Sequence, residues 1–427
     1  MEPPNPSPWR AWSWVPSLYF CQAIPNVAVT ALSATMFKQL GVSNAEITSW
    51  IAWLQLPWVF KGAWSPLVDR LGTKRSWTAV LQFFLGAALA SLALIIPGPD
   101  YLRWSLGLFW LLAFASATHD IAADGFYLLA LPPHLQAAFV GVRSTFFRAA
   151  NIAGQGGLVY LAGWLTEVTG DLRLAWSLVF VPPGVLFLVA GAYHLFALPR
   201  PAGDRPAPAA DRAAKASWAV VLGEFFRKPG IGVILAYLLL YRLGESQLVG
   251  VSRLFLLEDR AAGGLGLTAK EVGRAYGMYG IIALTAGGIL GGLAIARFGL
   301  RRMLWPMLLS MHLPNLAYVG LAVAQPEGFW MITAAVAFEQ LGYGFGFSAY
   351  MVYMMLVADG PHRTAHYAVC TSFMALGMML PMKFSGQIQE AIGYTAFFVW
   401  ACLATLPSFA VLPFLRVDPA FGRRRAG

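Results

Sequence analysis

The sequence predicts an all-α integral membrane protein, and both its composition and its long apolar runs point to this class. Of the 427 residues, 58% are hydrophobic and only 12% are charged, whereas a soluble domain carries about 25% charged residues. A soluble chain of this size could not keep so much apolar surface away from water. A membrane-spanning helix needs about 20 mostly apolar residues, and such runs follow one another along almost the whole chain.

Twelve apolar runs, separated by short segments that are often rich in proline or glycine, predict twelve transmembrane helices. We expect the first six near residues 12–36, 44–67, 76–97, 102–130, 137–166 and 173–197. We expect the second six near residues 229–257, 269–296, 303–324, 328–357, 364–390 and 394–415. The stretch 199–216 holds much proline, alanine and charge, which is typical of an extended linker. We therefore predict two six-helix bundles, at 1–198 and 229–427, joined by a cytoplasmic linker at 199–228.

The formal net charge of +10 comes from basic residues in the short segments between the apolar runs. Lys and Arg concentrate in the cytoplasmic loops of membrane proteins, and here they favour every second segment, including the one with Lys74 and the one with Arg301. This bias predicts that both termini are cytoplasmic. Nucleic acid is not an expected partner, because the basic residues do not form a face with interleaved aromatic side chains.

Motifs of enzymes and of cofactor sites do not occur in the sequence. It contains no Walker loop, no HExxH, no zinc-ligand spacing and no Gly-x-Ser-x-Gly elbow. The three cysteines, Cys21, Cys370 and Cys402, lie singly within apolar runs and form no metal or redox pair in sequence. We therefore expect neither an enzymatic activity nor a cofactor or metal.

A short basic turn occurs twice, each time between the second and third predicted helices of one half. The first copy contains Asp69, Arg70, Gly72, Lys74 and Arg75, and the second contains Arg297, Gly299, Arg301 and Arg302 at a constant offset. Ala296 takes the place of the acid in the second copy. Glycine permits a tight turn, and the basic cluster favours the cytoplasmic side. A repeat in matching places predicts two related bundles.

The paired Asp-Arg-x-Gly-x-Lys-Arg turn and the twelve-helix layout resemble the major facilitator superfamily of secondary transporters. This resemblance implies two bundles that rock about a central binding site. It also implies that the turns help to gate the movement. The residues expected to do so are Asp69, Arg70, Gly72, Arg75, Arg297 and Gly299.

Ionisable residues within the predicted spans are candidate functional residues, because charge at bilayer depth is costly and usually faces the bundle interior. Asp120 and Asp124 are four residues apart and share one helix face, with His119 beside them. Two carboxylates on one dry face favour reversible protonation, so we predict that these three residues couple transport to protons. The alternative is a structural ion pair with Arg143 or Arg148 of the next helix.

Other intramembrane charges occur singly or as a close couple. Glu339 has no basic neighbour in its own segment, which makes it a further candidate for proton coupling. Arg242 and Glu245 are three residues apart, so they either neutralise each other or serve binding or gating. Lys61 and Lys383 each follow a proline closely. We expect Lys383 to face a cavity, whereas Lys61 lies near a helix end from which it could extend to the interface.

Arg148, Asn151 and Gln155 follow helical spacing and form a polar stripe. Arginine matches carboxylate and phosphate groups, which favours a role in binding a polar or anionic substrate. A hydrogen-bonded seam between helices is the alternative. The predicted substrate-binding residues are Arg148, Asn151, Gln155, Lys383, Arg242, Glu245 and Lys61. Elsewhere, Gly287, Gly288, Gly291 and Gly292 follow small-xxx-small spacing, which predicts close helix packing and a surface on which helices can slide.

Five segments resemble successive motifs of the AmpG-like permease group: LPWVFKGAWSPLVDR, ASATHDIAADGF, YLLLYRLGES, FEQLGYGFG and AHYAVCTSFMALG. That group includes bacterial importers of muropeptides, and its relatives include acetyl-coenzyme A carriers and siderophore permeases. The resemblance implies a proton-coupled symporter that imports a muropeptide or related amino-sugar compound across a bacterial inner membrane. The alternatives are a siderophore or acyl-coenzyme A permease of the same fold, and a non-transporting membrane sensor or assembly factor.

The expected partners are therefore the lipid bilayer, protons and a small-molecule substrate, and we expect a monomer. In the predicted mechanism, Arg148, Asn151 and Lys383 contact polar or anionic groups of a substrate bound near the bilayer midplane, between the two halves. A proton on Asp124 or Glu339 lowers the cost of the reoriented state, so that an inward proton gradient drives import.

Overall fold

The computed structural model describes residues 8–131, 133–201, 203–204, 218–359, 363–419 and 421, and within these residues all regular structure is helical. Contacts between residues divide the chain into two compact units. Unit 1 comprises Met1–Met36 and Leu56–Ala214, and unit 2 comprises Phe37–Gln55 and Lys215–Gly427. The stretch Phe37–Gln55 thus belongs to unit 2 by its contacts, although it lies early in the sequence.

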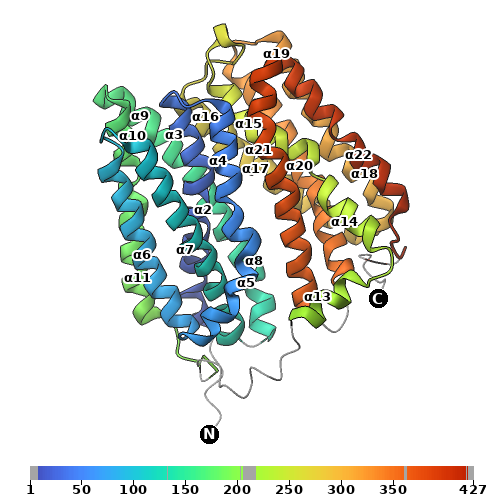
Figure 1. Cartoon of the computed structure of the whole chain (residues 1–427). Coiled ribbons are helices and arrows are strands. Elements are labelled where there is room, and N and C mark those ends of the chain that lie inside the picture. The colour runs from blue at the N-terminus through green and yellow to red at the C-terminus, as the bar shows by residue number, and fades with distance from the viewer. Residues whose placement is uncertain are drawn as a thin grey trace. The chain divides into compact units, whose positions relative to one another are not determined.

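Unit 1 is built from helices that lie alongside one another (Figure 1). Its elements are α1 (Pro8–Trp12), α2 (Val15–Val27), the π-helical η1 (Ala28–Leu32), the start of α3 (Ser33–Gln39), α5 (Leu56–Arg70), α6 (Lys74–Ile95), α7 (Tyr101–Ala130), α8 (Pro133–Ile152), the π-helical η2 (Ala153–Leu158), α9 (Val159–Thr169), α10 (Leu172–Val179) and α11 (Val181–Ala197). Helix α6 packs along α11 and α7, and α2 packs along α8. A Cβ atom at Gly86 of α6 would lie 3.0 Å from the Gly184 carbonyl oxygen of α11, so these two backbones touch.

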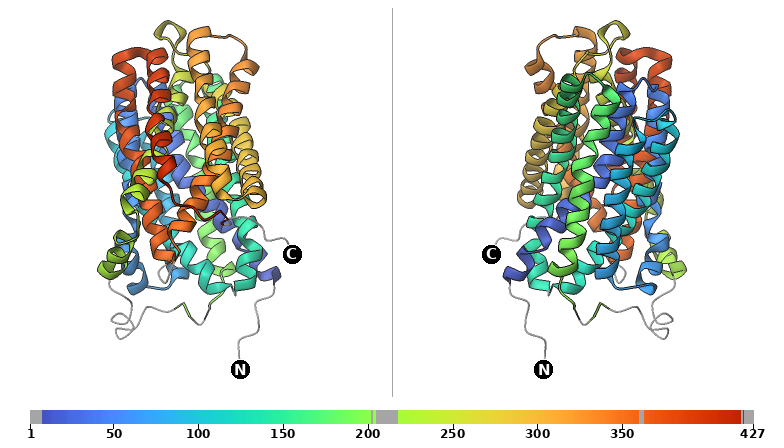
Figure 2. Two further views of the ribbon diagram at one scale, coloured as in Figure 1. Left: turned by 90° about the vertical axis from the view of Figure 1, so that its right-hand side faces the viewer. Right: turned by 90° about the vertical axis from the view of Figure 1, so that its left-hand side faces the viewer.

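Unit 2 is also helical, and Figure 2 shows its long helices from two further sides. Its elements are the end of α3, α4 (Asn44–Leu54), α13 (Trp218–Phe226), α14 (Ile231–Leu240), α15 (Leu243–Leu257), η3 (Arg260–Ala262), α16 (Ala269–Val272), the π-helical η4 (Gly273–Gly280), α17 (Ile281–Phe298), α18 (Leu300–His312), η5 (Leu313–Asn315), α19 (Leu316–Ala324), α20 (Phe329–Val357), α21 (Arg363–Leu403), α22 (Leu406–Val411) and η6 (Leu412–Phe414). Helix α20 packs against α17 and α18, and α21 packs against α15 and α4.

The contact between α17 and α20 is made by backbone against backbone. A Cβ atom added at Gly287 of α17 would strike the Leu341 carbonyl oxygen of α20. A Cβ atom added at Gly344 of α20 would strike the Leu284 carbonyl oxygen of α17. Glycine is therefore required on both sides of the contact. This confirms the predicted close packing at Gly287 and Gly291, whereas a Cβ atom at Gly292 would meet no neighbour within 4 Å.

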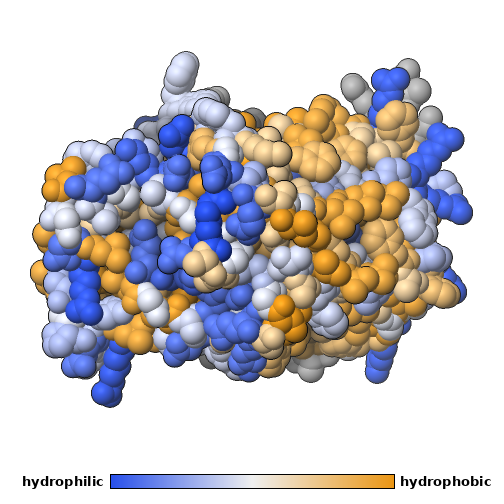
Figure 3. Space-filling model, turned by 90° about the horizontal axis from the view of Figure 1, so that it is seen from above, coloured by the Kyte–Doolittle hydropathy of each residue, from blue (hydrophilic) through white to orange (hydrophobic). Residues whose placement is uncertain are grey.

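The surface of the described helices carries many large apolar side chains. Leu94, Phe196 and Val323 are 83%, 88% and 68% exposed, as expected for side chains that meet lipid rather than water. Eight helices among the described residues are long and apolar enough to cross a membrane. The face seen in Figure 3 carries gathered hydrophilic residues beside hydrophobic ones. The pattern supports a multi-pass membrane protein.

Several predicted spans differ from the observed helices in detail. Those over 173–197 and 229–257 are each interrupted, the first between α10 and α11 and the second between α14 and α15. The run predicted as one helix over 44–67 is two helices, because α4 ends at Leu54 and α5 begins at Leu56. The predicted boundary at 390–394 lies inside α21, where Gly393 has φ 77° and ψ 168°. That conformation is open essentially only to glycine, so Gly393 supplies the break between the last two predicted helices.

Candidate functional site

Asp124 on α7 of unit 1 is held by two neighbours. Arg143 of α8 donates a hydrogen bond from its Nη2 atom to Asp124 Oδ1 over 2.9 Å, and the Tyr19 hydroxyl donates to the same oxygen over 3.1 Å. The Arg143 guanidinium also lies 4.2 Å from the centre of the Tyr19 ring and 5.0 Å from that of Tyr127. The charge of Asp124 is therefore balanced by a cation that stacks on two aromatic rings.

Asp120, one turn earlier on α7, has a basic partner of its own. Lys61 of α5 donates to Asp120 Oδ2 over 3.5 Å. The Asp120 side chain is 12% exposed and that of Lys61 is 37% exposed. The structure thus places Asp120 and Asp124 on one helix face, as their spacing predicts, and gives each a different cation. Of the two basic partners considered from the sequence for these acids, Arg143 is the one present.

His119 lies at the end of a buried chain of polar groups within unit 1. Its Nε2 atom accepts from the Gln82 amide nitrogen over 3.2 Å, and Gln82 Oε1 accepts from His194 Nδ1 over 2.7 Å. His194 Nε2 lies 2.9 Å from the Ser17 hydroxyl. The Nδ1 atom of His119 is buried and has no hydrogen-bond partner among the described residues. This chain of side chains joins α7, α6, α11 and α2.

The polar stripe lies where α8 passes into the π-helical η2. The Asn151 amide donates to the Phe147 carbonyl oxygen over 2.9 Å, and the Gln155 amide donates to Asn151 Oδ1 over 3.2 Å. Arg148 is half-buried and forms no hydrogen bond or ion pair with the residues that the structure describes. π-helical turns are rare and are frequent at functional sites. The stripe therefore consists of Arg148 and Asn151 at the end of α8 and Gln155 in the π-helical η2 that follows it.

Arg242 and Glu245 form a buried ion pair in unit 2. Arg242 Nε donates to Glu245 Oε2 over 2.9 Å, and Arg242 Nη2 donates to Glu245 Oε1 over 3.3 Å. The same Nη2 atom donates to the Tyr343 hydroxyl of α20 over 2.9 Å. The guanidinium also lies 5.2 Å from the centre of the Phe347 ring. The bidentate geometry satisfies both charges locally, which favours the neutralising role among the roles considered from the sequence.

Glu339 lies on α20 and is 1% exposed. Its Oε2 atom accepts from the Gln340 amide over 2.8 Å, whereas its Oε1 atom has no hydrogen-bond partner among the described residues. The Gln340 amide also donates to the Tyr276 hydroxyl of η4 over 3.4 Å. The Arg253 guanidinium lies over the Tyr276 ring at 4.9 Å. No basic side chain among the described residues is paired with Glu339, so its negative charge would be unbalanced.

Lys383 on α21 points at aromatic rings rather than at an acid. Its ammonium nitrogen lies 4.7 Å from the centre of the Trp53 ring and 4.8 Å from that of Phe384. Within the described part of the chain it forms no ion pair. An ammonium that lies over aromatic faces is stabilised there without losing its charge, so Lys383 can still meet an anionic group.

The first basic turn binds the segment that follows α11. Asp204 accepts from the Lys74 and Arg75 backbone amides over 2.6 and 3.0 Å, at the start of α6. The Arg75 side chain donates to the Leu198 carbonyl oxygen over 3.1 Å and to that of Leu195. A carboxylate at a helix N-terminus is favourable because it satisfies free amides and faces the positive end of the helix dipole. The side chains of Asp69 and Arg70 lie outside the described residues.

The second basic turn differs in its backbone. Gly299 has φ 85° and ψ 152°, a conformation that favours glycine, whereas Gly72 is not among the glycines with positive φ. The Leu300 amide, at the start of α18, donates to the Phe421 carbonyl oxygen over 3.0 Å. Arg297 is exposed and lies 5.6 Å from the Phe298 ring centre. Each turn therefore anchors a segment that follows its own unit's last helix.

Several polar side chains at these sites were not predicted from the sequence. They are Tyr19, Gln82, His194, Gln340 and Tyr343. Gln82 and His194 are single polar residues inside apolar runs, and this signal could have found them. The tyrosines carry no such signal, because most tyrosines in membrane helices serve packing or the interface.

The arrangement suits binding and proton exchange rather than covalent chemistry. Among the described residues, no group of three or more His, Cys, Asp or Glu could hold a metal ion. The charges at these sites are instead two acids that are each paired with a cation from another helix, the Arg242–Glu245 pair, the stacked cation Lys383, Arg148 on the polar stripe, and Glu339 with its amide partner. Such sets line the paths of polar solutes through membranes.

The sequence is similar to those of known membrane transporters. The family model described as Major Facilitator Superfamily matches residues 17–259. The anhydromuropeptide permease of Escherichia coli (strain K12) is 27% identical over 403 residues, covering 92% of this chain and 77% of that protein. The resemblance to AmpG-like permeases predicted from the sequence is thereby confirmed.

Solved transporter structures share the fold. The crystal structure of a D-xylose–proton symporter superposes with a TM-score of 0.69 at 13% identity, covering 95% of this chain and 98% of that one. That of the nucleoside transporter NupG superposes with a TM-score of 0.64 at 16% identity, covering 95% and 98%. At such low identity the likeness concerns the fold alone, and it confirms the predicted fold class.

Proposed function

This chain belongs to the Major Facilitator Superfamily and is a membrane transporter rather than an enzyme, and from that premise we propose that it imports a muropeptide or related amino-sugar compound by alternating access, driven by an inward proton gradient. The similarity to an anhydromuropeptide permease supports the substrate class. The environment of Glu339 supports the proton coupling.

Glu339 carries the proposal of proton coupling. A buried carboxylate whose one hydrogen-bond partner among the described residues is an amide pays a large desolvation cost when it is ionised. A bound proton removes this cost and gives the carboxyl group a donor of its own. We therefore assign the proton to Glu339 in the state that the structure shows. Asp120 and Asp124 are less suited to carry it here, because Lys61 and Arg143 balance their charges.

Substrate contact is proposed for two of the cations within the predicted spans that form no ion pair with the described residues. Arg148 of unit 1 stands on the polar stripe with Asn151 and Gln155, and its planar guanidinium suits a carboxylate. Lys383 of unit 2 lies over aromatic rings and can meet an anionic group as a point charge. Amides of the stripe can hydrogen-bond to sugar hydroxyls or peptide groups.

The proposal includes the setting of the transporter. We place it in a bacterial inner membrane as a monomer with two six-helix bundles, at 1–198 and 229–427, and with both termini in the cytoplasm. The bias of Lys and Arg between alternate segments supports this orientation. Accessibility of tags at each terminus in intact and in permeabilised cells tests it, and a tag reached in intact cells would reverse the assignment.

Uptake by proteoliposomes tests the function. The purified chain should accumulate labelled anhydromuropeptide under an inward proton gradient, and a protonophore should abolish the accumulation. Glu339→Gln should lose this accumulation but still exchange labelled for unlabelled substrate, because the neutral amide mimics the protonated state. Glu327→Gln is the matched control, since Glu327 is exposed just before α20 and should transport normally.

Two results would contradict the proposal. Uphill, protonophore-sensitive uptake by Glu339→Gln would remove the proton role of that residue. Competition of the uptake by chelated iron or by acyl thioesters, and not by unlabelled muropeptide, would replace the proposed substrate class with that of a siderophore or acyl-coenzyme A permease.

A further inference from the structure

A cavity of about 380 Å³ opens within unit 2 where three helical elements begin or end. Its wall includes Ile234 in the first turn of α14, Val357 at the end of α20, and Phe414 at the end of η6. Because α14 begins a membrane span and η6 ends one, this level of the molecule is where apolar helices meet the lipid headgroups.

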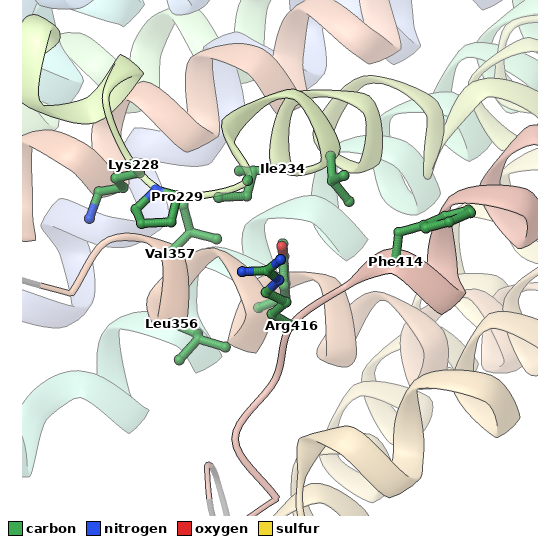
Figure 4. Close-up of a pocket in the computed structure, with 10 residues that line it drawn as sticks. Lys228, Pro229, Ile234, Leu356, Val357, Phe414 and Arg416 are labelled. Carbon is green, nitrogen blue, oxygen red and sulfur yellow. The ribbon is translucent and has the colours of Figure 1, made fainter.

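Two cations and one hydroxyl give the cavity its polar character. Arg416 reaches into its centre below Ile234, whereas Lys228 lies at its edge (Figure 4). Arg416 forms no ion pair with the described residues, and Lys228 donates to the Asp359 carbonyl oxygen over 2.9 Å. Tyr353 lines the cavity, is 2% exposed, and its hydroxyl forms no hydrogen bond with a described residue. None of the ten described lining residues is acidic.

The combination fits an anion that carries apolar chains. An arginine, a lysine and a free hydroxyl donor can together bind the oxygens of a phosphate group. The remaining wall is apolar, with Val233, Ile234 and Leu356 inside and Phe414, 69% exposed, at the margin. A free phosphate ion has no apolar surface to bury against this wall, whereas the acyl chains of a lipid reduce their contact with water when they pack against it.

We propose that this cavity binds the phosphate headgroup of an anionic phospholipid, with Arg416 and Lys228 as its cations and Tyr353 as a hydrogen-bond donor. Basic pockets between transmembrane helices at the cytoplasmic face bind such headgroups in other membrane proteins. The described residues that line the cavity do not include Glu339, Arg148 or Lys383, so the inference does not depend on the nature of the transported substrate. Its occupant would tie the chain before α14 to the chain after η6.

Native mass spectrometry of the full-length protein tests the site. The protein is purified in detergent and titrated with phosphatidylglycerol or with phosphatidylcholine of the same acyl chains. The wild type should retain phosphatidylglycerol preferentially. Arg416→Gln and Lys228→Gln should each weaken this binding about fivefold, the effect of one basic residue near an anionic lipid, and should leave phosphatidylcholine unchanged. Tyr353→Phe keeps the ring and should cause a smaller loss.

Arg227→Gln is the matched control, because Arg227 is an exposed neighbour of Lys228 that does not line the cavity. It should bind phosphatidylglycerol as the wild type does. Equal binding by Arg416→Gln, Lys228→Gln and the control would overturn the proposal. Displacement of the lipid by an excess of inorganic phosphate would overturn it too, because the occupant would then be a soluble phosphate. Unchanged unfolding temperatures of the variants show that each result reflects binding.

Discussion

Asp120 and Asp124 of unit 1 each lie beside a basic side chain from another helix. Among the residues that the structure describes, Glu339 of unit 2 accepts a hydrogen bond only from an amide. Unit 2 also holds Arg242 and Glu245, which neutralise each other within one turn of chain. Both units therefore contain buried acids, but only one described acid among these lacks a cation. The difference separates acids whose charge is balanced by a neighbouring cation from the one acid to which we assign the proton in the proposed function.

The same contrast appears at the repeated basic turns. Their sequences match in charge and in glycine position, yet only Gly299 has a positive φ. Asp204 occupies the start of α6 in unit 1, and the Phe421 carbonyl occupies the start of α18 in unit 2. In both copies the backbone amides at the start of the following helix donate to a segment near the end of the same unit. The acceptor is a carboxylate in the first copy and a backbone carbonyl in the second.

The largest expected effect comes from breaking the pair in unit 2. Glu245→Ala would leave Arg242 as a buried, uncompensated cation, and we expect a loss of about 3–5 kcal/mol in the free energy of unfolding. Chemical denaturation in detergent measures it. The double variant Arg242→Met, Glu245→Leu should recover most of the loss, because it removes both charges. Equal losses in the single and double variants would show that packing, rather than charge balance, is what the pair provides.

An intermediate effect separates the two turns. Gly299→Ala must hold a side chain at φ 85° and ψ 152°, which costs about 1–3 kcal/mol. Gly72→Ala should cost only about 0.5 kcal/mol, since its Cβ atom would meet the rotatable Ser76 hydroxyl at 3.2 Å. Thermal unfolding of the two variants side by side gives the comparison. A larger loss for Gly72→Ala would contradict the assigned backbone difference.

The smallest effects compare the acids themselves. Asp124→Asn removes the charge that Arg143 balances, and because Asp124 is 41% exposed we expect a loss of about 1 kcal/mol. Glu339→Gln should leave the unfolding free energy unchanged or slightly raised, because the amide resembles the protonated acid and removes a buried ionisable group. Denaturation curves at neutral pH measure both. A clear loss for Glu339→Gln would mean that Glu339 is ionised and paired.

The fold was predictable because its signals are long and repeated. Apolar runs of membrane-spanning length and the constant offset of the two basic turns indicate two related helical bundles without any tertiary information. The break between α4 and α5 was missed because the sequence around Gln55 is apolar on both sides, although Pro57 in the first turn of α5 is a signal of a helix start. The contacts that assign Phe37–Gln55 to unit 2 depend on distant parts of the chain.

The site was predictable to the level of residue types. Their position inside apolar runs identified Asp120, Asp124 and Glu339 as candidate functional residues, because burying a charge in a membrane is costly. Their partners could not be read in the same way, since Lys61 lies 59 residues from Asp120 and Arg143 lies 19 residues from Asp124. Only Arg242 and Glu245 could be paired from sequence, because helical spacing brings them together.

The backbone contact between α17 and α20 has a practical consequence for observing the transport cycle. With glycine on each side and carbonyl oxygens at the contact, the two backbones are packed directly against each other, so we expect these two helices to move together as one rigid unit. Spectroscopic reporters placed on the exposed faces of these two helices, for instance at Leu293 and Phe338, should keep one separation throughout turnover. The distance between these two reporters would then serve as a constant reference for measuring the displacement of the other helices.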